Sequence, residues 1–298
     1  MTELTKRIHH YFINPSGDAE RIFHGRGRMY PGLDHITIDI YPPVVLVTLF
    51  APPQAELVDE IRTILHQYNQ VEALVIQRRY IDKSPSEVVY GIIPNDHIVS
   101  ERGAKYSITL GQSQNSGLFL DMSEGRKWLN ANAYGKRILN LFSFTCSLSV
   151  AALKGGATHS VNFDMSKGVL NTGRLNHRIN GINMNNVEFF AYDILKSWGR
   201  IKKKGPYDIV IIDPPSFQKG SFVATKDYTK VVRRIADLIN PGGIVIASLN
   251  SPELDTHFIK DIFSKECPQS QFVTRIENPD TFPDTDSECS LKLMLFSL

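Results

Sequence analysis

From Lys136 onward, short apolar segments alternate with segments of helical periodicity. Apolar runs of strand length occur at 137–141, 160–163, 187–190, 207–212 and 244–249. Helices are expected between them at 148–154, 167–180 and 226–239, and after Ser251-Pro252. This alternation predicts parallel strands with helices on both faces of the sheet. Two further apolar runs, 271–276 and 291–296, predict a closing pair of strands.

The first hundred residues have a different pattern and predict a small α+β module. Strands are expected at 35–40, 44–50, 73–77, 88–93 and 106–110, and an amphipathic helix at 55–68. The polar loop 111–117 is the best boundary candidate. We therefore expect an α+β N-terminal domain at residues 1–110, with RNA binding as a candidate role. Residues 111–298 should form a Rossmann-like, doubly wound α/β domain with a mostly parallel, seven-stranded sheet.

Composition restricts the class of protein only slightly. The 298 residues are 42% hydrophobic and 21% charged, with a formal net charge of +2, which neither requires nor excludes a nucleic-acid partner. No apolar run approaches the roughly 20 residues of a membrane span, and the N-terminus does not resemble a signal peptide. We expect a cytoplasmic protein with no membrane partner. The three cysteines form no CxxC pair, and no metal site is expected. The oligomeric state stays open.

Acidic residues follow three of the expected parallel strands. Ligands of such sheets bind beyond the carboxyl ends of the strands. Asp164 lies roughly 20 residues past the end of the first strand, where nucleotide-binding units place a carboxylate that holds a ribose. Asp193 would contact an adenine amino group or, alternatively, cap a helix at 194–199. Either acid alone could also be a solvated residue at a helix start.

The loop after the first strand, Asn140–Ser149, contains no glycine. Dinucleotide-binding folds need glycines there, because the backbone must approach a pyrophosphate. A ligand without phosphates has no such requirement. S-adenosylmethionine is therefore the expected cofactor, and a nicotinamide oxidoreductase is the least favoured alternative.

The strongest motif is Ile211–Phe217, with the sequence IIDPPSF. An acid followed by two prolines at the end of a strand predicts a turn rich in carbonyl groups and without proline N–H donors. Such a turn directs a carboxylate and a backbone carbonyl into the pocket. This arrangement suits a nucleobase nitrogen that faces a methyl donor in line.

Residues 135–243 resemble class I S-adenosylmethionine-dependent methyltransferases. More narrowly, they resemble the group that contains the bacterial large-subunit ribosomal RNA methyltransferases, which modify cytosine C5 or guanine N7. The matching blocks are 117–126 (GLFLDMSEGR), 139–145 (LNLFSFT), 161–166 (VNFDMS), 174–176 with 180–181, and 213–217 (DPPSF). Cys146 stands where relatives often carry glycine. The N-terminal hundred residues show no clear copy of the PUA RNA-binding domain found in some members.

The resemblance implies which residues form the site. Asp164 would hold the ribose, with Met165 against the adenine, and Arg126 would face the cofactor carboxylate unless it is merely a surface charge. Asp213 and Pro214 would face the target base, with Phe217 stacking on it. The full set expected at the cofactor is Phe119, Asp121, Arg126, Asn140, Phe142, Ser143, Thr145, Asp164, Met165, Asp193 and Ile194.

The cysteines bear on which atom is methylated. Cytosine C5 is a poor nucleophile, so its methylation requires a cysteine thiolate that adds to the ring. In the cytosine-modifying relatives this cysteine follows the fifth strand, but here residues 246–251 read IASLNS. Cys146, Cys267 and Cys289 are expected to be packing residues. Transfer to nitrogen needs only alignment, so a nitrogen target is favoured and cytosine C5 is kept as an alternative.

Basic residues indicate where RNA would bind. The segment RIFHGRGR contains Arg21, Arg26 and Arg28, and the alternative to RNA binding is that it is a flexible arm. Two lysines, Lys219 and Lys226, follow the Asp-Pro-Pro turn. We expect methylation of a base in structured RNA, with 23S ribosomal RNA as the partner. The alternatives are methylation of an exocyclic amine in DNA or of a protein amide, and an RNA-binding protein that retains the cofactor without catalysis.

Overall fold

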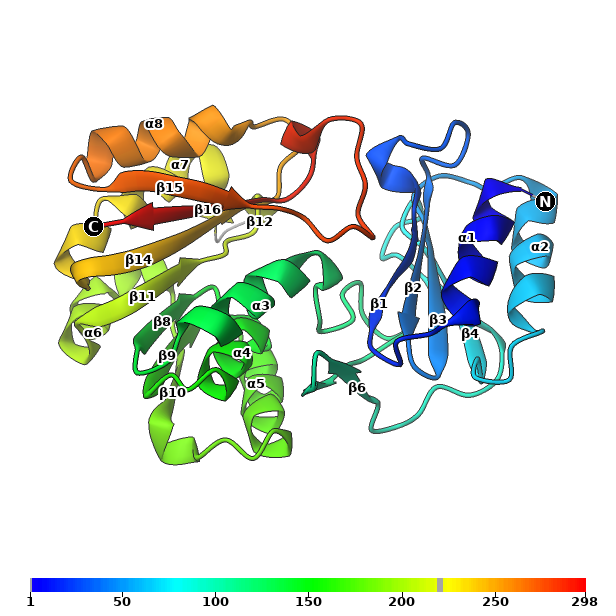
Figure 1. Ribbon diagram of the computed structural model, residues 1–298, viewed down its shortest axis with the longest axis horizontal. Coiled ribbons are helices and arrows are strands. Elements are labelled where there is room, and N and C mark those ends of the chain that lie inside the picture. Colours follow the sequence, from blue (N-terminus) through cyan, green and yellow to red (C-terminus); the bar gives the residue numbers. More distant parts are fainter. Residues whose placement is uncertain (1, 219–221) are drawn as a thin grey trace. The chain divides into compact units, whose positions relative to one another are not determined.

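The computed structural model describes residues 2–218 and 222–298, and it divides into two compact units (Figure 1). Unit 1 comprises Met1–Asp121 and Pro279–Asp286, and unit 2 comprises Met122–Asn278 and Ser287–Leu298. The division therefore falls later than the boundary expected at residue 110. In addition, the segment 279–286, which lies between the last two strands of unit 2, belongs to unit 1.

Unit 1 is built on a five-stranded sheet with strand order β1-β2-β3-β4-β5. Helices α1 and α2 pack on this sheet through the spaced apolar residues Leu4, Ile8 and Phe12 of α1 and Ile61 and Leu65 of α2. The bounds are α1 Glu3–Ile13, β1 Glu20–His24, β2 Ile36–Tyr41, β3 Val44–Leu49, α2 Ala55–Leu65, β4 Ala73–Arg78 and β5 Ser86–Tyr90. A separate hairpin of β6 (Ile98–Glu101) and β7 (Ala104–Ser107) follows.

The first two elements of unit 1 were not expected from the sequence. Helix α1 covers a segment with no predicted structure, and β1 with the 3₁₀ turn Gly25–Gly27 occupies the segment for which a flexible arm was the alternative to RNA binding. The carbonyl of Gly27 accepts a hydrogen bond of 2.9 Å from the N–H of Thr285. A Cβ at Gly27 would lie 1.8 Å from the carbonyl oxygen of Pro283, so only glycine fits here. The segment 279–286 is thus tightly packed within unit 1.

Unit 2 contains a seven-stranded sheet with strand order β10-β9-β8-β11-β14-β16-β15. The first five strands in this order are parallel, and β16 and β15 are antiparallel, which confirms the expected mostly parallel, doubly wound sheet. The strand bounds are β8 Arg137–Leu141, β9 His159–Asp164, β10 Val187–Ala191, β11 Tyr207–Ile212, β14 Ile239–Leu249, β15 Gln271–Ile276 and β16 Lys292–Ser297. A two-stranded antiparallel sheet, β12 Phe217–Gln218 with β13 Phe222–Val223, follows β11.

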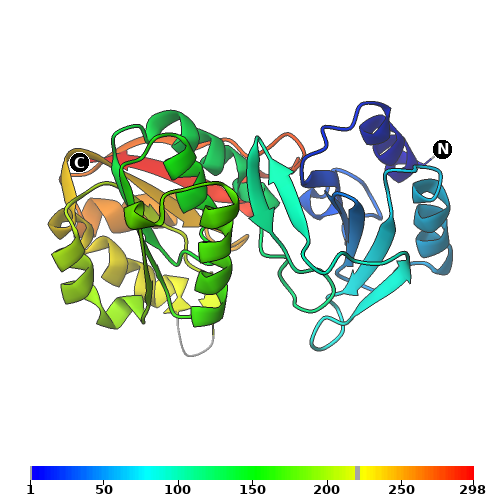
Figure 2. The same cartoon turned by 90° about the horizontal axis from the view of Figure 1, so that it is seen from below.

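Helices cover both faces of this sheet, as Figures 1 and 2 show. On one face, α3 (Ser123–Asn132) and α4 (Ser147–Lys154) pack against apolar side chains such as Ile138 and Ile211. On the other face, α6 (Trp198–Lys204), α7 (Ala224–Val232) and α8 (Thr256–Glu266) pack against residues such as Leu139 and Ile212. Helix α5 (Lys167–Ile179) lies next to α4. The alternation of buried residues along each strand therefore fixes the two layers of helices.

No helix within the described part of the chain is long and apolar enough to cross a membrane.

Candidate functional site

The expected site residues of unit 2 gather at one edge of its sheet. Strands β10, β9, β8, β11 and β14 are neighbours and run in the same direction, so the loops that follow them lie side by side. The order of strands reverses at β8, which has β9 on one side and β11 on the other. In sheets of this kind, the loops at such a switch point form the ligand site.

The loop after β8 has an unusual backbone. Phe142, Phe144 and Cys146 have φ angles of 58°, 47° and 61°, in the left-handed region that non-glycine residues rarely adopt. The loop is tied to β9 by a hydrogen bond of 2.9 Å from the N–H of Ser143 to the carbonyl of Phe163. Strained backbone of this kind concentrates at ligand sites, where the surrounding structure holds it in place.

Asp164, at the end of β9, holds this loop. One carboxylate oxygen accepts a hydrogen bond of 3.0 Å from the N–H of Phe144, and the other accepts one of 2.8 Å from the N–H of Ser166. Burial raises the pKa of the Asp164 carboxyl group, while these two donors act in the opposite sense. Each carboxylate oxygen has a second lone-pair direction, so the two backbone contacts leave capacity for ribose hydroxyls.

Buried polar atoms lie next to the loop. Asn140 on β8 is 1% exposed and donates a hydrogen bond of 3.1 Å to the side-chain oxygen of Asn162, and Thr145 accepts one of 2.9 Å from Asn176 at its carbonyl. Within the described chain, the buried Ser143 Oγ and Asn140 Oδ1 have no hydrogen-bond partner. A buried oxygen without a partner is costly. The donor groups of S-adenosylmethionine, such as its ammonium group, fit a site with such acceptors.

Arg126 is a buried residue of α3, with an exposed fraction of 2%. Its Nη1 lies 3.5 Å from the hydroxyl of Ser147, the first residue of α4. The alternative that Arg126 is a surface charge is therefore wrong. A buried guanidinium next to a helix N-terminus makes a positive environment that suits a carboxylate. Phe119 and Asp121 belong to unit 1, and their expected contact with the cofactor stays a prediction.

Asp193, after β10, caps the 3₁₀ turn Ile194–Lys196. Its carboxylate accepts a hydrogen bond of 3.0 Å from the N–H of Leu195 and pairs with Lys196 at 2.9 Å. Capping was the alternative role expected for Asp193 from the sequence. Its contact with the adenine amino group stays a prediction. Ile194 is buried and packs in the core, whereas Met165 is 49% exposed at the end of β9.

Asp213 follows β11 and is held from the neighbouring strand β14. The hydroxyl of Ser248 donates a short hydrogen bond to Asp213 Oδ1, and the carbonyl of Ser248 accepts one of 2.9 Å from the buried Tyr228 hydroxyl. Ser216 likewise donates to the carbonyl of Asn250. The Asp-Pro-Pro turn is thus fixed against the end of β14. Sequence reasoning placed Ser248 at the end of the fifth strand but did not identify its contact with Asp213.

The residues after this turn face different environments. The ring of Phe222 lies edge-on against that of Phe142 at 5.0 Å, so the segment after β11 contacts the loop after β8. Pro214 is buried, whereas Phe217 is 70% exposed. Lys226 is exposed on α7. Lys219, expected to contact RNA, lies outside the described residues.

The cysteines differ in their surroundings. Cys146 is fully buried, and burial raises the pKa of its thiol to about 12. Cys267 is buried at the end of α8. Cys289 is half-buried, and the residues on both sides of it accept hydrogen bonds at their carbonyls from Lys292 Nζ, which also bonds the carbonyl of Ser251. The turn of Cys289 therefore lies near the end of β14.

The three arginines of unit 1 that were expected to bind RNA have separate environments. Arg21 is largely buried and forms a two-point ion pair with Asp39, at 2.7 and 3.0 Å. Arg26 is exposed, with its guanidinium 4.3 Å from the ring centre of Phe50, and Arg28 is exposed and pairs with Asp284 at 3.3 Å. Among the residues that the structure describes, no cluster of three or more His, Cys, Asp or Glu residues could hold a metal ion.

Comparisons with known proteins agree with this geometry. A family model for S-adenosylmethionine-dependent methyltransferases matches residues 20–297. Ribosomal RNA large subunit methyltransferase I of Aeromonas salmonicida is 28% identical over 226 residues, which cover 72% of this chain and 57% of that protein. Ribosomal RNA large subunit methyltransferase K/L of Shewanella pealeana is 34% identical over 158 residues, which cover 51% of this chain and 22% of that protein. The chain thus spans little more than half of the first relative and less of the second.

A solved structure, described as a candidate methyltransferase complexed with S-adenosylhomocysteine (SAH), shares the fold with a TM-score of 0.88. It is 26% identical, and the match covers 99% of this chain and 79% of that one. SAH is what S-adenosylmethionine becomes after it has given up its methyl group, in agreement with the cofactor expected here. The match of the family model over nearly the whole chain shows that this protein belongs to the family of S-adenosylmethionine-dependent methyltransferases.

Proposed function

We propose that the chain methylates a ring nitrogen of a base in ribosomal RNA, with 23S ribosomal RNA as the substrate. The observation that carries this proposal is the Asp-Pro-Pro turn, whose Asp213 is fixed by Ser248 beside the loop after β8. The names of the two ribosomal RNA methyltransferase relatives support the choice of RNA.

The residues of the turn would position the base. S-adenosylmethionine, when bound, supplies the electrophilic methyl group. Pro214 and Pro215 have no N–H groups, so the turn offers carbonyl and carboxylate acceptors to the base. Asp213 would accept a hydrogen bond from a base N–H and hold the target nitrogen in line with the methyl group. The Ser248 hydroxyl on β14 holds the carboxylate, and Tyr228 on α7 holds the carbonyl of Ser248. The geometry of the carboxylate is therefore set before the substrate arrives.

The nitrogen target is favoured by the end of β14. Asn250 and Ser251 occupy the place after the fifth strand where cytosine-C5 chemistry needs a cysteine. Neither an amide nor a hydroxyl without an adjacent base is a sufficient nucleophile. Lys292 connects the turn of Cys289 to the carbonyl of Ser251, so Cys289 is the residue on which the cytosine alternative depends.

Contacts to the RNA backbone are proposed at four cationic side chains. Arg26 and Arg28 of unit 1, and Lys226 with Lys219 after the Asp-Pro-Pro turn, would bind phosphates. Arg21 already pairs with Asp39 and would support the surrounding surface.

The proposal is tested by methyl transfer to RNA. The purified protein is incubated with radiolabelled S-adenosylmethionine and bulk RNA from a strain that lacks the protein, and the RNA is digested to identify the labelled nucleoside. A nitrogen-methylated base in 23S ribosomal RNA is expected. An absence of label in the RNA, with label transferred when DNA or protein of the same strain is supplied instead, would refute the proposal. A label at cytosine C5 would refute the nitrogen target.

A further inference from the structure

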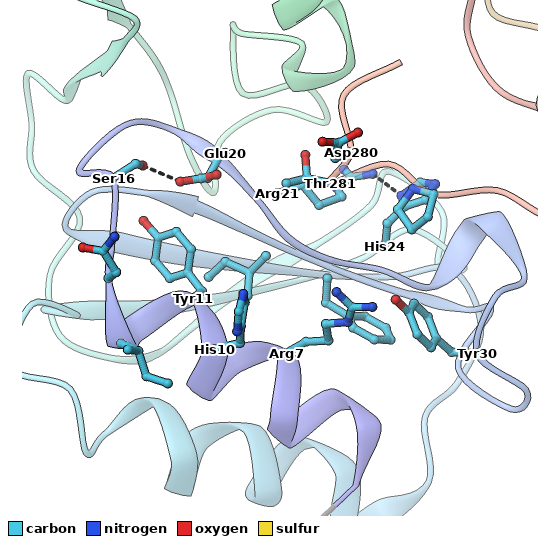
Figure 3. Close-up of a pocket in the computed structure, with 15 residues that line it drawn as sticks. Arg7, His10, Tyr11, Ser16, Glu20, Arg21, His24, Tyr30, Asp280 and Thr281 are labelled. Carbon is cyan, nitrogen blue, oxygen red and sulfur yellow. Dashed lines mark hydrogen bonds between the residues drawn. The ribbon is translucent and has the colours of Figure 1, made fainter. Parts of the chain in front are cut away.

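Unit 1 contains a cleft of about 520 Å³ that the proposed chemistry does not use. It lies between α1, β1 and the segment 279–286, and Figure 3 shows the side chains that line it. Its volume is in the range of sites for small molecules and single nucleotides. All of its walls belong to unit 1.

One end of the cleft combines an arginine with an aromatic ring. The guanidinium of Arg7 lies 5.6 Å from the ring centre of Tyr30, and Figure 3 shows the two side chains next to each other. Tyr30 packs in turn on the buried Phe23, with ring centres 4.9 Å apart. Arg7 also pairs with Glu3 at 3.5 Å, but both side chains are about half exposed, and such surface pairs are weak. Arginine planes and aromatic faces together are surfaces on which unpaired bases stack.

The other end offers hydrogen-bond acceptors. Figure 3 shows Glu20 with Ser16 above Tyr11, and Asp280 with Thr281 on the segment 279–286. The Ser16 hydroxyl donates to Glu20. Burial raises the pKa of Glu20, and it raises that of Tyr11 to about 12, so this end is partly shielded from water. A ligand for this end must carry N–H or O–H donors.

The charged side chain at the floor of the cleft is paired with its neighbours. Arg21 is held by Asp39 through two hydrogen bonds, and its Nη1 lies 2.7 Å from Nδ1 of His24. Burial and the neighbouring arginines lower the pKa of His24 to about 3, so His24 is neutral and its Nδ1 accepts this bond. The ring centre of Phe282, in the segment 279–286, lies 4.3 Å from the Arg21 guanidinium. The positive charge of Arg21 is therefore already matched, and Arg7 and His10 remain the basic groups at the opening.

We propose that this cleft binds one unpaired nucleotide of RNA. The base stacks on Tyr30 and Arg7, the Arg7 charge faces the backbone, and Glu20 and Asp280 accept hydrogen bonds from the base edge and the ribose hydroxyls. The two carboxylates disfavour a bare anion, and the charged lining disfavours a lipid tail. This inference rests on the proposed function in one respect only, namely that RNA is the substrate.

Binding is measured by fluorescence anisotropy with a labelled, mixed-sequence, single-stranded RNA of twelve nucleotides and the full chain. We expect Arg7→Ala and Tyr30→Leu each to weaken binding at least about fivefold, the order expected for losing one stacked base. Arg7→Lys, which keeps the charge but not the plane, should recover only part of the loss. The matched control is Lys6→Ala on the same helix, since Lys6 also pairs with Glu3 and does not line the cleft. Thermal unfolding of each variant verifies that unit 1 is folded.

The outcomes separate this inference from the proposed function. If the protein methylates RNA but folded Arg7→Ala and Tyr30→Leu variants bind as the Lys6→Ala control does, the cleft inference is overturned and the proposed function stands. If methyl transfer to RNA is absent but binding still depends on Arg7 and Tyr30, the proposed function fails and the cleft inference stands. Equal competition by duplex RNA of the same sequence would also overturn the inference, because paired bases cannot enter the cleft.

Discussion

The thiol of Cys146 occupies the space that a side chain at Gly173 would need. A Cβ built on Gly173, in α5, would lie 2.6 Å from Cys146 Sγ and 3.2 Å from its Cβ. Cys146 precedes α4 with a left-handed φ of 61° and is fully buried. Cys146, which stands where relatives often carry glycine, therefore fits in the loop after β8 because Gly173 of α5 has no side chain.

This relationship predicts a compensating pair of substitutions. Gly173→Ala should destabilise the protein by about 1–3 kcal/mol, because the buried contact is overpacked. Cys146→Gly removes the thiol and suits the left-handed backbone, so the double variant should regain most of the lost stability. Urea denaturation of the wild type, both single variants and the double variant gives the coupling energy. Simple additivity of the two single effects would show that the residues do not interact.

Asp164 is predicted to affect both cofactor affinity and the loop after β8. Asp164→Ala should weaken S-adenosylmethionine binding by about 1–3 kcal/mol, because a charged acceptor is lost and the N–H groups of Phe144 and Ser166 lose their partner. Titration calorimetry measures the affinity. Asp208→Ala is the matched control, since Asp208 also accepts from a backbone N–H, that of Arg137, but at the start of β11. If Asp164→Ala binds S-adenosylmethionine as tightly as Asp208→Ala does, Asp164 is not part of the cofactor site.

The sequence was sufficient for the sheet of unit 2, because each parallel strand is an apolar run that ends in polar residues. It was insufficient for β1, where Arg21 is buried only because Asp39 on the adjacent strand neutralises it. A buried ion pair between distant residues has no signature in hydrophobic periodicity. The assignment of 279–286 to unit 1 was equally hidden, since this loop is held by backbone contacts such as that between Thr285 and Gly27.

In the candidate site, too, some residues could be predicted from the sequence and others depend on tertiary contacts. Asp164 and Asp213 were identified because motifs place them at strand ends. Ser248 was missed as the partner of Asp213, because this contact depends on β11 and β14 being neighbours in the sheet. Tyr228 of α7, which holds the carbonyl of Ser248, was missed as well. The burial of Arg126 was likewise decided by the packing of α3 on the sheet.

Asp213 is predicted to act mainly in turnover. Asp213→Ala should spare S-adenosylmethionine binding and lower kcat by about 100-fold, because a base that is misplaced by a small distance reacts slowly. Ser248→Ala keeps the carboxylate but removes its hydrogen bond, so a smaller loss, about tenfold, is expected. Single-turnover rates with saturating cofactor and RNA measure both. A wild-type rate for Asp213→Ala would make the turn structural.

His177 is predicted to make stability depend on pH. Its Nδ1 donates to the carbonyl of Gly173 at 2.7 Å, and its Nε2 lies 2.9 Å from the hydroxyl oxygen of Ser149. Burial lowers the pKa of His177 from 6.5 to about 4, so between these values the unfolded chain binds a proton that the folded chain does not. The free energy of unfolding should therefore fall by about 2 kcal/mol from pH 7.5 to pH 5. His177→Gln should flatten this dependence in urea denaturation, and an unchanged slope would contradict the assignment.

The last prediction is that no cysteine attacks the base. Attack on a cytosine ring requires a thiolate, and burial raises the pKa of Cys146 to about 12, which keeps it protonated at neutral pH. Cys267 is buried at the end of α8. Cys289 is the critical case, because Lys292 connects its turn to Ser251, two residues after β14.

Cys289→Ser should accordingly retain methylation of the same nucleoside at a rate within about twofold of the wild type, since a residue outside the reaction contributes no transition-state interaction. Cys146→Ser and Cys267→Ser serve as controls for the effect of losing a buried thiol on stability. RNA that contains 5-fluorocytosine provides the opposite test, because a catalytic cysteine would be trapped in a covalent complex that survives denaturation. A trapped complex that disappears in Cys289→Ser would assign Cys289 as the nucleophile, and the target would then be cytosine C5 rather than a ring nitrogen.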